Sequence, residues 1–458
     1  MFSAIEAERL ILSLVTPIEA VETVALDDVT SCLGRVLAAP VTSQLDFPHW
    51  DNSAMDGYAV RAQDVQQVPA TLQIIEEIPA GQRPIKTVGP LQAARILTGA
   101  MMPEGADTVV MQEETERLTS LSQESASAAP VSAEPILSEQ NGRGDGRDDS
   151  DQVIILRSPK HQSFVRKQGS FSRAGDELLS AHRAIAPAEI ALLAAAQCPQ
   201  VSVYRRPRVA ILSTGSELVR PDQALGPGQI VDSNQYALSA LIAQTGAIPV
   251  PLGIVQDDRE GVKRAIALAL SQADMVLSSG GVSVGDYDYV DDVLAELGAT
   301  LHIRAVAVKP GKPLTVAGFQ QGRRSANDSA QPSVAGGGES RVGCQLYFGL
   351  PGNPASAMVG FWRFVAPAIA KLSGLQGPWS PEFVWATATT DLQAGGRRET
   401  YLWGQLVAGE SGYEFGRAAG SHSSGNLVNL ANTTGLGVVP QGETKIASGS
   451  PVRVLKIN

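Results

Sequence analysis

Between residues 208 and 370, apolar strands alternate with amphipathic helices, and this alternation constrains the fold more than any other feature of the chain. Buried apolar strands joined by helices predict a parallel sheet that is covered on both faces. The expected elements, in chain order, are a strand entering a turn (208–218), a helix that ends at Gly246 (234–247), a strand (248–255), a helix (258–273), a strand (274–281), a helix (289–299), and a strand, turn and long helix (344–374).

The sequence on either side of this region is rich in β-strands. Residues 376–458 contain short strands separated by glycine, which is typical of a small β-barrel, and residues 42–169 are also β-rich. Two segments, at about 118–150 and 321–341, are instead rich in Ser, Ala, Gly and charged residues and have little to bury. Because both interrupt β-rich sequence, we predict that they are disordered insertions in hairpin loops.

The composition excludes several classes of protein. The chain has 458 residues, 43% of them apolar, which is enough for roughly three domains. Its 47 acidic and 36 basic residues give a net charge of −11, which argues against nucleic-acid binding. The three cysteines are far apart and form no CxxC pair, so neither disulfides nor a zinc site is expected. No apolar run approaches the roughly 18 residues of a membrane span, and the charged N-terminal segment predicts an amphipathic helix rather than a signal peptide. We therefore expect a cytoplasmic protein that does not enter a membrane.

Three of the predicted strands end in loops of small residues. In open α/β sheets, ligands bind at the carboxyl ends of the strands. Glycine lets backbone N–H groups approach an anion, and hydroxyl groups add further donors. One such loop alone is more often a surface turn, but three at one edge favour a site for a phosphorylated ligand. The residues expected to contact that ligand are Ser213, Thr214 and Gly215 in the first loop, Ser278, Gly280, Gly281 and Ser283 in the second, and Pro351, Gly352 and Asn353 in the third.

Carboxylates accompany these loops. Glu217, Asp257 and Asp288 each follow a predicted strand end, so the sheet could bring them together. A divalent cation such as Mg²⁺ prefers a few carboxylates together with phosphate oxygens. The alternative is that Glu217 and Asp257 only begin helices, where the helix dipole favours acids.

Two further motifs are rich in polar residues. In "KPGKP" (309–313), two prolines and a glycine define a tight turn that carries Lys309 and Lys312, and rigid lysines in an acidic protein suit an oxyanion. A solvated surface turn is the alternative. In "FPHWDNSAMDGYAVR" (47–61), a dense polar cluster that includes Asp56 lies beside aromatic residues. No helix or strand periodicity explains it, so a site is favoured over a structural turn.

Together these motifs carry a family resemblance. "DNSAMDGYAVR", "TGAMMPEGADTVVMQEE" (98–114), "STGSEL", "SSGGVSVGDYDYV", "KPGKP" and "GLPGNPAS" occur in this order. The chain resembles the molybdopterin molybdenumtransferases, enzymes of molybdenum cofactor biosynthesis that are related to the C-terminal part of gephyrin. The resemblance covers nearly the whole chain apart from the two insertions.

The resemblance implies an elongated homodimer with four domains in each chain. These are a discontinuous N-terminal domain (1–45 and 170–205), an inserted β-rich domain (46–169), an α/β molybdopterin-binding domain (206–375) and a C-terminal β-barrel (376–458). In the family, each active cleft lies between the α/β domain of one subunit and the inserted domain of its partner. Asp56 and Thr98 would then complete the site of the partner subunit.

The family reaction takes adenylylated molybdopterin and molybdate, hydrolyses the adenylate with Mg²⁺, and yields the molybdenum cofactor and AMP. By resemblance, Glu217, Asp257 and Asp288 match acidic positions of the family, and Mg²⁺ ligation is expected above all of Asp288. The resemblance also implies possible partners, namely the molybdopterin-adenylylating enzyme and molybdenum enzymes or their chaperones. The residues that match the molybdate pocket are Lys309, Lys312 and Pro313, with Arg397 or Arg398 and Ser423 or Ser424 from the last domain.

Two positions depart from the family pattern, and two other functions remain open. Ser170-Phe171 follow "RKQG" where the family usually has acids, and Ala305 occupies a position that is commonly basic, with Arg304 beside it. The first alternative function is a non-catalytic dimeric scaffold of the gephyrin type. The second is molybdopterin adenylyltransferase, an activity found in a single-domain protein with a similar α/β domain. Release of AMP upon addition of molybdate would separate the three.

Overall fold

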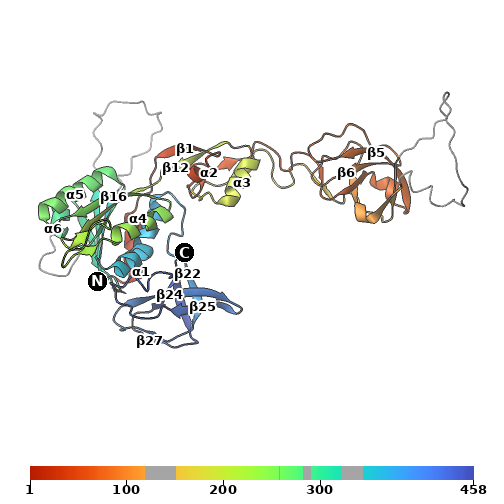
Figure 1. The fold of residues 1–458 in the computed structure, drawn as a ribbon. Helices are drawn as coiled ribbons and strands as arrows, with labels where there is room; N and C mark the ends of the chain where they lie inside the picture. The colour runs from red at the N-terminus through yellow and green to blue at the C-terminus, as the bar shows by residue number, and fades with distance from the viewer. Residues whose placement is uncertain (119–150, 257, 282–289, 321–343, 458) are drawn as a thin grey trace, which may run out of the picture. The chain divides into compact units, whose positions relative to one another are not determined.

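The computed structural model describes residues 1–118, 151–256, 258–281, 290–320 and 344–457 (Figure 1). The chain divides into two compact units, one of Met1–Ala39, Ser180–Ala194 and Cys198–Asn458, and one of Pro40–Leu179 and Ala195–Gln197. Residues 119–150 and 321–341 of the two predicted insertions lie outside the described residues, as do the predicted site residues Asp257, Ser283 and Asp288. The division into four domains stays a prediction.

The larger unit contains a six-stranded sheet in the order β16-β13-β17-β21-β20-β18. The first four strands run parallel, as the alternating pattern predicted. β20 runs antiparallel to β21, which agrees with a hairpin around the second insertion, and β18 runs antiparallel to β20. The bounds are Arg208–Thr214 for β13, Ile248–Val255 for β16, Met275–Ser279 for β17, Thr300–Ala305 for β18, Pro313–Gln320 for β20 and Cys344–Leu350 for β21.

Helices cover both faces of this sheet because alternate residues of each strand point to opposite sides. Ile211 and Phe348 belong to one apolar cluster, whereas their neighbours Leu212 and Tyr347 belong to a second. The first cluster includes side chains of α1 (Ala4–Leu14), α4 (Asn234–Gln244), α7 (Pro354–Gly360) and α8 (Ala366–Leu372); the second includes side chains of α5 (Arg259–Gln272) and α6 (Val290–Glu296).

The helix predicted after the last parallel strand differs in detail from the expectation. Residues 353–374 were expected to form one long helix, but α7 and α8 are joined by a π-helical segment, Phe361–Val365. Asn353 stands at the N-cap of α7, which begins at Pro354, yet the Asn353 side chain makes no capping hydrogen bond.

The last part of the chain is a closed five-stranded β-barrel, as predicted. Its strands are β22 (Phe383–Ala388), β24 (Glu399–Gly409), β25 (Gly412–Arg417), β26 (Gly435–Val439) and β28 (Pro451–Lys456). Pairings β22–β25, β25–β24, β24–β26, β26–β28 and β28–β22 close the ring. Glycine is required at position 437, where a Cβ would lie 2.4 Å from the Phe415 ring. A further short pair is β23 (Leu392–Gln393) with β27 (Lys445–Ile446).

The remaining segments of the larger unit join residues far apart in the sequence. β1 (Val21–Ala25) pairs with β12 (Gln200–Tyr204), close to α2 (Val29–Cys32) and α3 (Pro187–Ala195) (Figure 1). In contrast, α1 belongs to the core of the α/β region, where Ile11 packs in the same cluster as Phe364. No helix among the described residues is long and apolar enough to cross a membrane.

The smaller unit is β-rich, and its main sheet has the order β7-β4-β6-β5-β9-β8. β8 and β9 pair antiparallel on either side of the first insertion, with Leu118 opposite Gln152, as expected for a hairpin. The strands are β4 (Gly57–Val60), β5 (Ala70–Ile78), β6 (Gln92–Ile96), β7 (Thr108–Met111), β8 (Thr115–Leu118) and β9 (Gln152–Ile155); shorter pairs are β3 (Asn52–Ser53) with β10 (Val165–Arg166) and β2 (Val41–Thr42) with β11 (Glu177–Leu179).

Candidate active site

The three loops of small residues meet at one edge of the α/β sheet. β13, β17 and β21 are neighbours and parallel, with Ser213 opposite Ser279 and Ser279 opposite Leu350. β16 follows β13 in the chain but lies on the side of β13 away from β17, so the strand order changes direction between β13 and β17. Such a switch point is where open α/β sheets place their ligands.

Glycine allows the backbones of these loops to approach closely. Gly280 has φ of +88°, and a Cβ there would lie 2.3 Å from the carbonyl oxygen of Thr214. Its backbone N donates to the carbonyl oxygen of Leu350 at 3.2 Å. A Cβ on Gly352 would stand 3.6 Å from the Gly280 Cα. The described parts of the loops after the three strands therefore lie in close backbone contact.

Several buried polar atoms at this edge lack a partner. Ser213 Oγ, Thr214 Oγ1 and Asn234 Oδ1 have no hydrogen-bond partner among the described residues. The Asn234 amide nitrogen donates to Ser279 Oγ at 2.6 Å and to the carbonyl oxygen of Gly352 at 2.7 Å, so Asn234 ties two of the loops together. Buried polar groups are normally paired, so these atoms are available to accept or donate a hydrogen bond to a ligand at this edge. Ser278 differs, because its hydroxyl bonds the Tyr347 hydroxyl at 2.5 Å.

"KPGKP" lies at the junction between the sheet and the barrel. β19 (Val308–Lys309) pairs in parallel with β24, which places Lys309 opposite Thr400. Gly311 then turns the chain with φ of +103°. Lys309 and Lys312 are both exposed and line a cavity of about 680 Å³, which we name the KPGKP cavity.

The KPGKP cavity is strongly cationic. Among its described lining residues there are four cations and no carboxylate, although the whole chain carries a net charge of −11. Such a concentration of positive charge suits a compact oxyanion. Arg398 lines the cavity and the exposed Arg397 does not, whereas Ser423 and Ser424 both line it. The lining residues used in this argument are Lys309, Lys312, Pro313, Asn353, Arg398, Arg417, Ser423 and Ser424.

The barrel contributes polar groups to this cavity that the sequence analysis did not identify. Trp403 Nε1, Arg417 Nε and His422 Nδ1 are buried and have no partner in the described part of the chain. His422 stacks on Trp403, with ring centroids 4.4 Å apart, and its Nε2 donates to the Ala418 carbonyl oxygen at 2.9 Å. Burial lowers the pKa of His422, so the ring is neutral at neutral pH and its Nδ1 is an acceptor. The signal in the sequence was a glycine-rich loop, 416–425, that contains an Arg and a His.

In the smaller unit, Asp56 and Thr98 form one polar element. Asp56 Oδ1 accepts hydrogen bonds from the backbone N of Thr98 at 2.6 Å and from its hydroxyl at 2.7 Å. The hydroxyl and backbone hydrogen bonds from Thr98 lower the pKa of Asp56. The exposed carboxylate is therefore ionised and held in one orientation.

Other residues of the 47–61 motif shape the backbone around Asp56. Ser53 is fully buried and its hydroxyl bonds the carbonyl oxygen of Met55 at 2.5 Å. A Cβ on Gly57 would lie 1.9 Å from the Val110 carbonyl oxygen, so only glycine allows β4 and β7 to pair there. The polar cluster therefore contains both residues that stabilise a turn and one exposed acid, Asp56.

Comparison with known proteins gives matches to three successive parts of the chain. Three family models match, described as the MoeA N-terminal region (domain I and II) at residues 2–196, a probable molybdopterin binding domain at 210–371, and the MoeA C-terminal region (domain IV) at 386–457. A molybdopterin molybdenumtransferase from a Nostoc species is 49% identical over 100% of this chain and 94% of its own length. This chain belongs to the molybdopterin molybdenumtransferase family.

Two further comparisons show lower identity. A molybdopterin molybdenumtransferase from Haemophilus influenzae is 31% identical and covers 93% of this chain and 91% of its own length. A crystal structure of a molybdopterin biosynthesis MoeA protein from Pyrococcus horikoshii has a TM-score of 0.74, with 24% identity and complete coverage of both chains. That likeness concerns the fold.

The two positions that differ from the family pattern, Ala305 and Ser170-Phe171, have different surroundings. Arg304, beside Ala305, pairs with Asp291 through its Nε at 3.0 Å and does not line the KPGKP cavity. Arg304 therefore adds no positive charge to the lining of that cavity, whereas Arg417 lines it from the barrel. Phe171, in the other departing pair, has 72% of its surface exposed.

The described residues do not form a complete Mg²⁺ site. Among them, no three His, Cys, Asp or Glu side chains are grouped to hold a metal ion. Of the three predicted ligands only Glu217 is described, and its Oε2 lies 2.7 Å from where a Cβ on Gly215 would stand. A hard cation needs several oxygen ligands, and one carboxylate does not provide them. The Mg²⁺ requirement of this family member stays a prediction.

Proposed function

We propose that this chain inserts molybdenum into adenylylated molybdopterin, using molybdate, and releases AMP with the finished cofactor. The observation that carries the proposal is the KPGKP cavity, where four cations and no carboxylate occur among the described lining residues and where Asn353 of the third glycine-rich loop also lies. A tetrahedral dianion such as molybdate is attracted there by charge, and the pyrophosphate-linked ligand is held by the loops.

Each group has a distinct role in this proposal. Lys309, Lys312 and Arg398 bind the molybdate oxygens, and Ser423 supplies a hydroxyl donor. The unpartnered Thr214 hydroxyl and the backbone N–H groups around Gly280 bind the phosphates. The oxyanion is thereby brought close to the sulfur atoms that receive the metal, and proximity is a large part of what such a site can contribute to the rate.

Asp56 is proposed to act in the site of the partner subunit of a homodimer. Two observations support this proposal. Asp56 is exposed and ionised, and Thr98 holds its carboxylate in one orientation. Asp56 also belongs to the smaller unit, whereas the KPGKP cavity belongs to the larger one. An ionised carboxylate can accept a proton from the water that attacks the adenylate. We further propose that Mg²⁺ is bound by Asp288 with Asp257 and Glu217, and that the protein acts in the cytoplasm, which its three free cysteines favour.

The test is to incubate the purified protein with adenylylated molybdopterin and to measure AMP release with and without molybdate. We expect release that depends on molybdate, together with a product that activates an apo-molybdenum enzyme. A scaffold would release no AMP, and an adenylyltransferase would instead consume ATP and molybdopterin; either result would refute the proposal. Lys312→Ala should lower the molybdate dependence, whereas the control Lys263→Ala, at a surface ion pair with Glu296, should not.

A further inference from the structure

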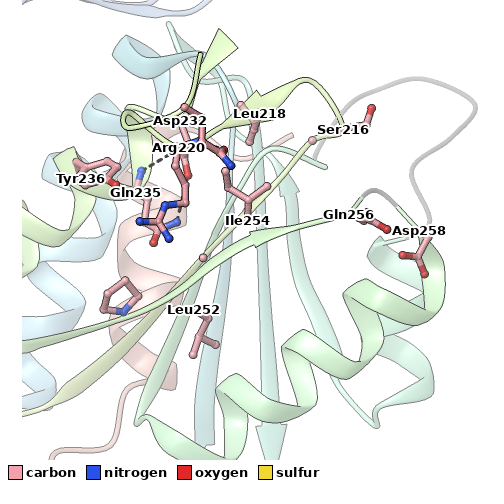
Figure 2. Close-up of a pocket in the computed structure, with 14 residues that line it drawn as sticks. Ser216, Leu218, Arg220, Asp232, Gln235, Tyr236, Leu252, Ile254, Gln256 and Asp258 are labelled. Carbon is pink, nitrogen blue, oxygen red and sulfur yellow. Dashed lines mark hydrogen bonds between the residues drawn. The ribbon is translucent and has the colours of Figure 1, made fainter. Parts of the chain in front are cut away.

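The described lining of the KPGKP cavity contains no carboxylate, whereas that of a larger cavity in the same unit contains two. The larger cavity, of about 850 Å³, lies beside β16, and Asp232 and Asp258 line it (Figure 2). An acid is nevertheless close to the KPGKP cavity, because Glu399 lies in the sequence between two of its lining residues, Arg398 and Thr400. The contacts of the Glu399 side chain therefore determine whether its charge reaches the cavity.

The Tyr401 hydroxyl holds the Glu399 carboxylate. Tyr401 lines the KPGKP cavity, is 1% exposed, and donates from its hydroxyl to Glu399 Oε1 at 2.5 Å. Burial raises the pKa of Tyr401, so the hydroxyl keeps its proton and is a donor at neutral pH. The carboxylate is thus one hydrogen bond away from a lining residue without belonging to the described lining itself.

Arg363 fixes the direction in which Tyr401 donates. Its Nε donates to the Tyr401 hydroxyl oxygen at 2.9 Å, and its guanidinium pairs with Glu8 of α1. Arg363 is 3% exposed, does not line the KPGKP cavity, and belongs to the π-helical segment Phe361–Val365. Such segments are frequent at functional sites. Because the hydroxyl oxygen accepts from Arg363, its single proton is directed to Glu399.

Strand pairing fixes the backbone on either side of this contact. The Glu399 backbone N donates to the Ala307 carbonyl oxygen at 3.0 Å, and the Arg398 guanidinium donates to the Val308 carbonyl oxygen at 3.2 Å. The Thr400 hydroxyl donates to the Arg398 carbonyl oxygen at 3.1 Å. The Glu399 carboxylate can therefore change its position by rotation of its side chain, without movement of the strand.

We propose that Tyr401 is a positioning residue that keeps the Glu399 carboxylate away from the four cations of the KPGKP cavity. Hydrogen bonds between a carboxylate and Lys or Arg are strong, so a carboxylate released by Tyr401 would pair with a cation that otherwise binds the oxyanion. Molybdate would then have to displace an acid of the protein itself. The inference rests on the proposed function, in which molybdate is the anion of this cavity.

Tyr401→Phe tests the inference, because it removes the hydroxyl and keeps the ring. We expect the Kd for molybdate, measured by isothermal titration calorimetry on the full chain, to rise about tenfold, since the anion loses roughly one charged hydrogen bond. The KM for molybdate in AMP release should rise in parallel, with a smaller effect on kcat. The Tm should also fall, because the substitution removes the acceptor of the buried Arg363 Nε.

A second substitution separates the effect of charge from that of stability. Tyr401→Phe combined with Glu399→Gln should recover most of the affinity for molybdate, because the amide has no charge with which to compete. Its Tm should stay as low as that of Tyr401→Phe, since phenylalanine cannot hydrogen-bond the amide. Tyr401→Phe combined with Glu414→Gln is the matched control and should recover nothing: Glu414 is an exposed acid on β25, outside the KPGKP cavity.

Glu399→Gln alone keeps an acceptor for the Tyr401 hydroxyl and tests the inference without loss of that contact. It should bind molybdate no more weakly than the wild type, because the removed charge is one that the anion does not need. Weaker binding would mean that the carboxylate supports the site, and it would refute the inference. Affinities that follow the Tm through all four variants would refute it as well, because the contact would then be structural only.

The calorimetric measurements need no turnover. A protein that binds molybdate with the expected pattern but releases no AMP would contradict the proposed function alone. A protein that inserts molybdenum, yet binds molybdate equally well as wild type and as Tyr401→Phe, would contradict this inference alone. A wild-type protein that binds no molybdate would contradict both.

Discussion

Thr98 donates two hydrogen bonds to a single carboxylate oxygen of Asp56, from its backbone N at 2.6 Å and from its hydroxyl at 2.7 Å. The two residues lie on separate loops of the smaller unit, and Gly99 follows with φ of +83° and donates its N–H to the Ser53 carbonyl oxygen. The loop of Thr98 and Gly99 therefore orients the Asp56 carboxylate, and the same loop is hydrogen-bonded to the segment that contains Asp56.

Thr98→Val should shift the pH dependence of activity. The hydroxyl is the largest cause of the lowered pKa of Asp56, so its removal should raise that pKa. Activity that needs the ionised carboxylate should then be lost at a higher pH as the solution is acidified. The pH profile of AMP release, together with ¹³C NMR titration of the carboxyl carbon, measures the shift. Thr115→Val is the control, since that hydroxyl bonds the Gln112 carbonyl oxygen elsewhere in the unit. A profile identical to the wild type would exclude this role for Thr98.

Mixing two inactive variants tests whether the site is shared between subunits. If Asp56 acts in the partner's site, a heterodimer of Asp56→Asn and Lys309→Ala chains contains one intact cleft and one doubly damaged cleft. With free exchange at equal amounts, about half the dimers are heterodimers, so roughly a quarter of wild-type activity should return. A site built from one chain carries a lesion in every copy. No recovery after exchange verified by native mass spectrometry would place Asp56 outside the partner's site.

Arg398→Gln should raise the KM for molybdate roughly tenfold, because charged hydrogen bonds to an oxyanion contribute on the order of 1.5–3 kcal/mol. Arg397→Gln is the matched control, since Arg397 is adjacent, exposed and outside the KPGKP cavity. Initial rates of AMP release over a molybdate series provide the measurement. Equal effects of the two substitutions would mean that general surface charge, rather than the cavity, attracts molybdate.

Arg363→Met should destabilise the larger unit. Arg363 is 3% exposed, pairs with Glu8 of α1, and donates from Nε to the Tyr401 hydroxyl at 2.9 Å. The substitution leaves the largely buried Glu8 carboxylate without its cationic partner, which costs on the order of 3–5 kcal/mol. Urea unfolding followed by tryptophan fluorescence gives the loss. Adding Glu8→Gln to Arg363→Met should restore part of it, and a double variant no more stable than the single one would argue against the unpaired charge as the cause.

Some features followed from local sequence because their physical cause is local. The strands and helices between 208 and 370 were predictable because burial on one face imposes a period on the side chains. The loops with Thr214 and Gly280 were predictable as neighbours because parallel strands put their carboxyl ends at one edge. Lys309 and Lys312 were identified because proline and glycine between them restrict the turn.

Other features depend on contacts between distant segments. The sequence left Arg397 and Arg398 as equal candidates, and the register that pairs Val308 with Glu399 decides between them. Both arginines precede β24, and the guanidinium of Arg398 donates to the Val308 carbonyl oxygen at 3.2 Å, which holds Arg398 beside "KPGKP". The same holds for Arg417 and His422, which join the site only because the barrel packs beside "KPGKP".

The sequence by itself determined the α/β sheet, its glycine-rich edge, the barrel and the lysines of "KPGKP", because side-chain periodicity and turn chemistry act over a few residues. Only the tertiary structure decided that Arg398 lines the cavity, that Trp403 and His422 add unpartnered groups to it, and that α1 packs on the α/β core through Ile11. These depend on register and on packing between segments far apart in the chain, which no local pattern encodes.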